Sequence, residues 1–236
     1  MTLGDIVANS VGNEDGEYVS GWDPDNDYLC TWGVVNNKGK ETGVYKYLPK
    51  WQTEEDQWWE GHTPGWYASD DDDFANCMNG VKLPYGEGAV IKSNPSATLT
   101  FSGEVKAGIT DVPVNKYKIS GNSYPVSIKL GKIKTNSAGL DGEYASGWNP
   151  DDDYLCTWDV VSNKGKETGV YKYLPAWQTE VGAWWEGHTP GWYLSDDDDF
   201  ANCYNEKVNL DPGDGFVIKS NPTSAITIEV EPFANK

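Results

Sequence analysis

The side chains best suited to chemistry lie in a ten-residue run that occurs twice. Trp58–Tyr67 reads Trp-Trp-Glu-Gly-His-Thr-Pro-Gly-Trp-Tyr, and Trp184–Tyr193 is identical to it. Half-exposed aromatic rings can stack on the C–H faces of sugars, and carboxylates accept hydrogen bonds from sugar hydroxyls. In the first copy, the predicted carbohydrate-binding residues are Trp51, Trp58, Trp59, Glu60, His62, Trp66 and Tyr67. In the second copy, they are Trp177, Trp184, Trp185, Glu186, His188, Trp192 and Tyr193. The alternative is an aromatic cluster that closes a thin β-domain.

A second candidate site is acidic, and it too occurs in both copies. The predicted metal ligands are Asp23, Asp25, Asp27, Asn149, Asp151 and Asp153. Their side-chain oxygens alternate along the chain and could converge on calcium, which takes roughly 6 to 8 oxygen ligands. Tyr28 stands where an EF-hand loop needs glycine, so this is not an EF-hand. We favour the alternative interpretation, an Asx-type turn that leads into a strand at Tyr28.

A run of four aspartates follows each aromatic run, at 70–73 and 196–199. Adjacent carboxylates repel one another, so a positive feature should compensate them. We predict a short helix over Asp73–Asn79, capped by Ser69, whose positive N-terminal end lies beside the acids. Bound calcium is the alternative.

The four cysteines are spaced equally in the two copies. The repetition predicts the disulfides Cys30–Cys77 and Cys156–Cys203, which would place the protein in an oxidising compartment. Four buried thiols are the alternative. No Cys-x-x-Cys pair occurs, so a structural zinc site is not expected.

Composition excludes several classes of partner. The net charge is −19, and all 18 basic residues are lysines. Phosphate binding needs a basic surface, so we expect neither nucleic acid nor an anionic membrane as partner. No apolar run is long enough to span a bilayer, and no signal peptide is visible.

The two copies define the organisation of the chain. Tyr18–Cys77 and Tyr144–Cys203 align without a gap, and 50 of 60 positions are identical. Frequent Gly, Pro, Asn and Asp separate short apolar or alternating runs, which is typical of all-β proteins. We therefore predict two tandem, homologous β-sandwich-like or small barrel domains, each with a short helix at most. Their predicted bounds are 1–103 and 127–236, with a strand-like connector at 104–126.

The pattern also predicts individual strands and turns. In the first copy the strands are Tyr28–Val35, Gly43–Leu48, Gln57–Glu60, Gly65–Ala68, Gly88–Lys92 and Thr98–Val105. In the second they are Tyr154–Val161, Gly169–Leu174, Ala183–Glu186, Gly191–Leu194, Gly215–Lys219 and Ala225–Val230. Turns are predicted at Asn36–Gly39 and Gly86–Gly88. The connector has no counterpart before the first copy, so we expect either that the chain is a piece of a longer array or that an edge strand is open to another copy of the chain.

Two segments carry a resemblance to a known class of module. Leu83–Asn94, followed by Thr98–Val105, and Leu210–Asn221 resemble β-rich repeat modules of exported bacterial surface proteins, which have a Pro-Gly-Glu-Gly-Phe-like turn before two strands. The first copy departs from this pattern at Tyr85 and Ala89. The resemblance implies an extracellular β-module and specifies no ligand.

These observations favour a non-catalytic protein, outside the cell or on its surface, that binds glycan bivalently, with or without calcium. The alternative is a structural or adhesive surface or filament subunit that assembles through open β edges. A glycoside hydrolase is a third class, since Glu54, Glu60 and many aspartates are available. The single histidine of each copy has no recognisable nucleophile motif beside it.

Overall fold

The structure is a computed structural model that describes residues 1–35, 38–83, 89–102, 108–113, 117–122, 124, 126–161 and 164–230. The predicted turn Gly86–Gly88, and residues 36 and 37 of the other predicted turn, lie outside these ranges. The protein is all-β, as predicted. Within these ranges the helical segments are short 3₁₀ turns, and none is long and apolar enough to cross a membrane.

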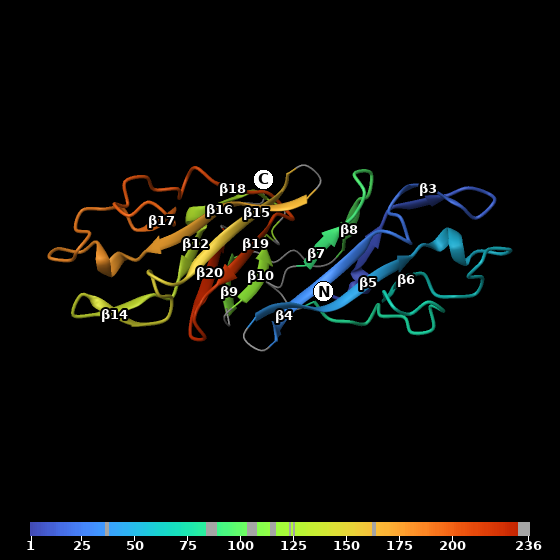
Figure 1. Ribbon diagram of the computed structural model, residues 1–236, viewed down its shortest axis with the longest axis horizontal. Coiled ribbons are helices and arrows are strands. Elements are labelled where there is room, and N and C mark those ends of the chain that lie inside the picture. Colours follow the sequence, from blue (N-terminus) through green and yellow to red (C-terminus); the bar gives the residue numbers. More distant parts are fainter. Residues whose placement is uncertain are drawn as a thin grey trace. The chain divides into compact units, whose positions relative to one another are not determined.

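Two compact units make up the chain (Figure 1). The first holds the described residues of Met1–Trp32, Glu41–Tyr85 and Ala89–Glu104. The second holds the described residues of Gly33–Lys40 and those from Gly108 onward, so it includes the described part of the segment predicted as a connector. Both strands of that segment, β9 (Gly108–Pro113) and β10 (Tyr117–Gly121), pair with strands near the C-terminal end of the second unit.

The first unit is built on a four-stranded sheet with the order β6-β5-β4-β7. Its strands are β4 (Tyr28–Val35), β5 (Lys38–Leu48), β6 (Gly65–Ala68) and β7 (Ala89–Lys92). Two smaller pairs join β1 (Ile6–Ala8) to β8 (Leu99–Phe101) and β2 (Ser10–Gly12) to β3 (Tyr18–Gly21). The 3₁₀ turns are η1 (Leu3–Asp5) and η2 (Lys50–Thr53).

The second unit repeats this plan with additional strands. Its main sheet has the order β10-β19-β15-β16-β17, with β15 (Tyr154–Val161), β16 (Lys164–Leu174), β17 (Gly191–Leu194) and β19 (Gly215–Lys219). A second sheet has the order β12-β20-β9, with β12 (Ile133–Thr135) and β20 (Ala225–Val230). The remaining elements are β11 (Ile128–Lys129) paired with β18 (Asn209–Leu210), β13 (Ala138–Leu140) paired with β14 (Glu143–Ser146), η3 (Leu130–Lys132) and η4 (Ala176–Gln178).

Most predicted strands are present, and the described ones form several open sheets rather than a closed barrel. The strands predicted at Gln57–Glu60 and Ala183–Glu186 are wrong. Both segments are turns, in which the backbone N–H of Glu60 donates to the carbonyl of Gln57, and that of Glu186 donates to Ala183. The adjacent tryptophans imitate the apolar pattern of a strand, but they belong to a loop.

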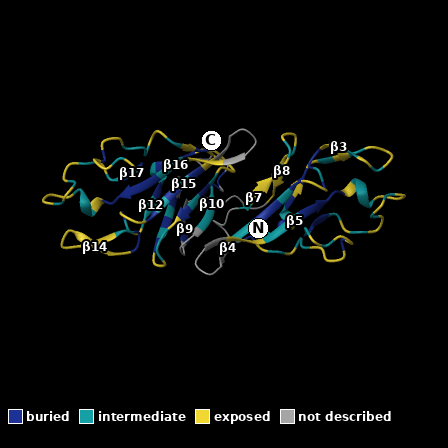
Figure 2. Cartoon of the chain, viewed as in Figure 1, coloured by how far each residue is buried: buried dark blue, intermediate teal, exposed yellow. Residues whose placement is uncertain are grey.

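A buried tryptophan anchors the core of each unit. The indole Nε1–H of Trp66, on β6, donates to the carbonyl of Ile6, on β1, at 2.8 Å. Trp192 makes the same 2.8 Å bond to Ile133. Trp22 meets Trp66 edge-on, with the ring centroids 5.4 Å apart. Figure 2 shows that the buried residues gather on strands of the main sheets, whereas the outlying loops are mostly exposed.

The predicted disulfides are absent, because all four thiols are free in this structure. The thiols have different surroundings. Cys30 lies in the sheet, where burial and the nearby Glu41 carboxylate raise the pKa of its thiol. Cys77 is exposed, and its backbone forms an isolated antiparallel β-bridge with Tyr67.

Replacing Trp192 by Phe should lower the free energy of unfolding by about 2 kcal/mol, because the buried carbonyl of Ile133 loses its donor. Urea unfolding measures this change. Trp158→Phe, at a half-exposed strand position, is the control and should cost far less. Equal losses would contradict a role for the indole hydrogen bond.

All four cysteines should react with iodoacetamide when the protein is unfolded without reductant. In the folded protein, exposed Cys77 should react well before Cys156, because burial raises the pKa of the Cys156 thiol to about 12 and leaves little thiolate. Mass spectrometry of the labelled peptides measures both results. Failure of the unfolded, unreduced chain to react would restore the disulfide prediction.

Candidate functional site

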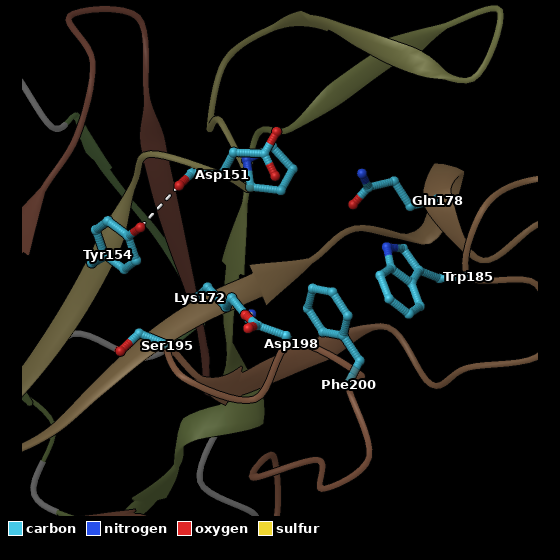
Figure 3. Close-up of a pocket in the computed structure, with 9 residues that line it drawn as sticks. Asp151, Tyr154, Lys172, Gln178, Trp185, Ser195, Asp198 and Phe200 are labelled. Atoms are coloured by element: carbon cyan, nitrogen blue, oxygen red, sulfur yellow. Dashed lines mark hydrogen bonds and ion pairs between the residues drawn. The ribbon is translucent and has the colours of Figure 1, made fainter.

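Each unit contains a pocket at the edge of its main sheet. In the second unit the cavity is about 270 Å³, and its lining residues are Pro150, Asp151, Tyr154, Lys172, Gln178, Trp185, Ser195, Asp198 and Phe200. Figure 3 shows Gln178 and Trp185 on one side of this pocket and Asp151 and Tyr154 on the other, with Lys172, Asp198 and Phe200 between them. The strands β15 and β16, the turn η4 and the two loops around β17 therefore all contribute to it.

The first unit has the same pocket, with a cavity of about 260 Å³. Its lining residues are Pro24, Asp25, Tyr28, Lys46, Gln52, Trp59, Ser69, Asp72 and Phe74. Every one of these nine has the same residue type as its counterpart 126 positions later. The ten differences between the aligned copies therefore all fall outside the pocket lining.

Aromatic rings form one wall of the pocket. The Trp185 and Phe200 rings pack edge to face, with centroids 4.7 Å apart. The Lys172 ammonium lies 4.6 Å from the centroid of Phe200 and 3.4 Å from the Asp198 carboxylate. Because Asp198 and Phe200 both contact this ammonium, the only lysine lining the pocket is already partnered.

The pocket also offers polar groups. The Tyr154 hydroxyl donates to the backbone carbonyl of Asp151 at 2.9 Å. The Oε1 atom of Gln178 is buried without a hydrogen-bond partner, and so is that of Gln52 in the first unit. A buried acceptor with no donor costs free energy.

The structure divides the predicted aromatic residues into three groups. Trp59 and Trp185 line the pockets. Trp58 and Trp184 project from the same loops and are 86% and 91% exposed. The core holds the remaining rings of the two runs, namely Trp66, Tyr67, Trp192 and Tyr193. The alternative interpretation of the sequence, an aromatic cluster that closes a thin β-domain, thus describes these four residues.

The other residues predicted to bind carbohydrate make contacts that hold the loops carrying Trp58 and Trp184 in place. Trp51 donates through its indole N–H to the Ser10 hydroxyl and lies against Gly12, where a Cβ would meet its ring at 2.3 Å. Trp177 is placed in the same way against Gly139. The Glu60 and Glu186 carboxylates accept hydrogen bonds from backbone amides of their own loops, and the rings of His62 and His188 lie edge-on to Trp59 and Trp185.

The Asp23–Asp27 segment forms the Asx-type turn. Asp23 accepts from the backbone N–H of Asp25, and Asp27 accepts from the backbone N–H of Asp23 and from Asn94. Asn149, Asp151 and Asp153 repeat the arrangement. In the described part of the chain no three acidic, His or Cys side chains form a group that could hold a metal.

Sequence reasoning missed most of the pocket. Lys46, Gln52, Ser69 and Phe74 come from separate segments, and nothing in their spacing brings them together. Asp25 and Asp151, which the sequence predicts as metal ligands, line the pockets. Identity between the copies was the one available signal, and it is too general to select these positions.

The four-aspartate run does not begin a helix, so the helix predicted over Asp73–Asn79 is wrong. The Asp71 carboxylate accepts from the backbone N–H groups of Ala75 and Asn76, which closes a tight loop with Phe74 at φ +47°. Asp197 makes the same bonds in the second unit. This loop places Phe74 in the pocket lining.

Asp71 and Asp197 should make the free energy of unfolding depend on pH in the acidic range. Backbone N–H groups, that of Asn76 first, hold the Asp71 pKa below its ordinary value of 3.8, and that of Ala201 is the main cause for Asp197. A lowered pKa stabilises the fold above pH 3.8, and the benefit is lost as pH falls through the folded-state pKa. The double variant Asp71→Asn, Asp197→Asn should be less stable than the parent at about pH 6, and the difference should shrink in acid.

Urea unfolding across this pH range measures that difference. The double variant Asp70→Asn, Asp196→Asn removes the same charge and is the control. A difference that does not change with pH would contradict the assigned role of Asp71 and Asp197.

Comparison with known proteins adds no assignment to this geometry. No protein-family model, curated protein or solved structure matches the chain.

Proposed function

We propose that the protein is a non-catalytic, bivalent carbohydrate-binding protein with one site in the pocket of each unit. The observation that carries the proposal is the repetition of the same nine lining residues in both pockets. Each set combines an aromatic wall with a hydroxyl, a carboxylate and an unpartnered amide oxygen. Sugars present alternating C–H faces and hydroxyls, and this combination of groups complements both.

The charges favour a neutral sugar. The lysine in each pocket is paired with an aspartate, Lys46 with Asp72 at 3.5 Å and Lys172 with Asp198 at 3.4 Å. Asp25 and Asp151 add a further carboxylate to each lining. An anionic sugar would meet net negative charge in both the pocket and the whole chain, whose net charge is −19.

The cavity size favours recognition of a terminal sugar residue. Pockets for drug-sized ligands enclose roughly 300–1,000 Å³. A cavity of about 270 Å³ is smaller and holds a small part of an oligosaccharide. Two such sites on one chain raise the avidity for a surface that displays many identical ends. Such surfaces are found mainly on cells and in the material around them, so we place the proposed function outside the cell.

Exposed Asp198 provides a test that should leave the fold intact, because its side chain is 94% exposed and its carboxylate pairs with Lys172. In titrations with neutral oligosaccharides, followed by calorimetry, the parent should bind at two equivalent sites. Asp198→Ala should weaken one site about tenfold, the loss expected when a charged hydrogen bond of about 1.4 kcal/mol is removed. Asp72→Ala should weaken the other, and the double variant both.

Asp70→Ala with Asp196→Ala is the matched control, since it removes neighbouring charges that do not line the pockets. The titrations should be run with calcium and with chelator, and binding lost in chelator would assign calcium a part. Absence of binding in both would contradict the proposal. Release of reducing sugar would replace it by a hydrolase whose candidate acids include Asp151 and Asp198 of the pocket lining.

A further inference from the structure

The two units differ in how their sheet edges end. The strand registers show which residues of the two units correspond. In the small sheets, Ile6 of β1 lies opposite Phe101 of β8, and Ile133 of β12 lies opposite Ile228 of β20. In the main sheets, β7 pairs with β4 as β19 pairs with β15. Thus β7 corresponds to β19, and β8 corresponds to β20.

In the second unit, both of these strands have a partner on their outer edge. β10 pairs with β19 from Tyr117↔Lys219 to Gly121↔Gly215. β9 pairs with β20 from Pro113↔Ala225 to Gly108↔Val230. The two covering strands are consecutive in the chain and together complete both sheets.

In the first unit, the described residues provide no strand at either position. β7 is the end strand of its sheet, and β8 pairs with β1 alone. Among the described residues, the outer edge of each strand therefore has no partner strand, and such an edge is a template for another strand.

Side chains on the core side of these strands are left uncovered. Ile91 lies opposite buried Leu29 yet is 44% exposed, whereas its counterpart Ile218 is 0% exposed. Phe101 lies opposite buried Ile6 yet is 53% exposed, whereas Ile228 is 1% exposed. Figure 2 shows β8 as an exposed strand.

We propose that the outer edges of β7 and β8 form a docking site for an extended polypeptide segment with the two-strand pattern of β9 and β10. One strand would continue the main sheet beyond β7, and the other would lie along β8. The second unit supplies the precedent, because Val112 of β9 is fully buried opposite Ile226, the counterpart of Leu99. Backbone pairing would provide affinity, and an apolar residue at the Val112 position would provide specificity.

The proposed occupant is a segment other than the β9 and β10 of a second copy of this chain. A copy that donated its own β9 and β10 would expose Phe216, Ile218, Ile226 and Ile228 in its second unit. That exchange uncovers buried apolar side chains in the donor while it covers apolar side chains in the acceptor, so we expect little net burial from it. The proposal is independent of carbohydrate binding, since no residue of β7 or β8 lines a pocket.

Hydrogen exchange on the full chain tests this site, with a synthetic peptide of residues 108–121 as the probe. A saturating excess of peptide should slow exchange of the β7 and β8 amides by about tenfold or more. A peptide carrying Val112→Asp, and one of reversed sequence, should give no protection. Unchanged exchange with the parent peptide would overturn the proposal.

Variants of the protein separate docking from folding. Ile91→Lys and Phe101→Lys alter side chains that are already half exposed, so the fold should persist while the peptide's protection falls at least about tenfold. Val7→Lys, on β1 at a 49% exposed position opposite Thr100, is the matched control and should retain protection. Sedimentation of the protein without peptide completes the test. A monomer agrees with the proposal, and dimerisation abolished by Phe101→Lys would assign the edge to a second copy and overturn it.

Discussion

The structure depends on one buried hydrogen bond in each unit, from a tryptophan indole to a backbone carbonyl. Trp66 lies on the main sheet and Ile6 lies on the small sheet, so the bond from Nε1 to the carbonyl joins the two across the core. Trp192 and Ile133 do the same in the second unit. Such a bond has a defined length and direction, and it therefore sets the spacing of the sheets more narrowly than apolar contact alone.

The pocket follows from this arrangement. Tyr67 is the neighbour of Trp66 on β6, and its buried ring packs edge-on against Phe74 at 5.0 Å. Phe74 in turn contacts Trp59 at 4.7 Å and lies 4.5 Å from the Lys46 ammonium. The core therefore continues outward into the pocket wall, and the Asp71 loop holds Phe74 in place. A binding surface supported in this way loses little conformational freedom when a ligand binds.

The differences between the copies have a structural meaning. The nine pocket residues are unchanged, whereas Gly182 and Ala183 replace Asp56 and Gln57 at the tip of an exposed loop. The larger difference lies at the sheet edges, where the second unit buries apolar residues under β9 and β10 and the first leaves their counterparts exposed. Each unit thus has its own pocket with the same lining residues, but the two units differ in the sheet edges that they offer to another strand.

The sequence by itself determined the all-β class, the duplication and the bounds of β4, β6, β15, β17, β19 and β20, because alternating apolar residues and turn residues act over short range. It failed at the Trp58 loop, where adjacent rings imitate a strand. It also failed at the four aspartates, where the Asp71 carboxylate accepts two hydrogen bonds from backbone N–H groups and the segment forms a loop instead of a helix. It also failed at the cysteines, because equal spacing does not show that thiols meet. Only the tertiary structure decided which tryptophans are core and which line a pocket, and which edges stay open. Those outcomes depend on residues that are far apart in the chain and close in space, such as Pro24 and Phe74, which line one cavity. The local sequence pattern does not predict which distant residues meet.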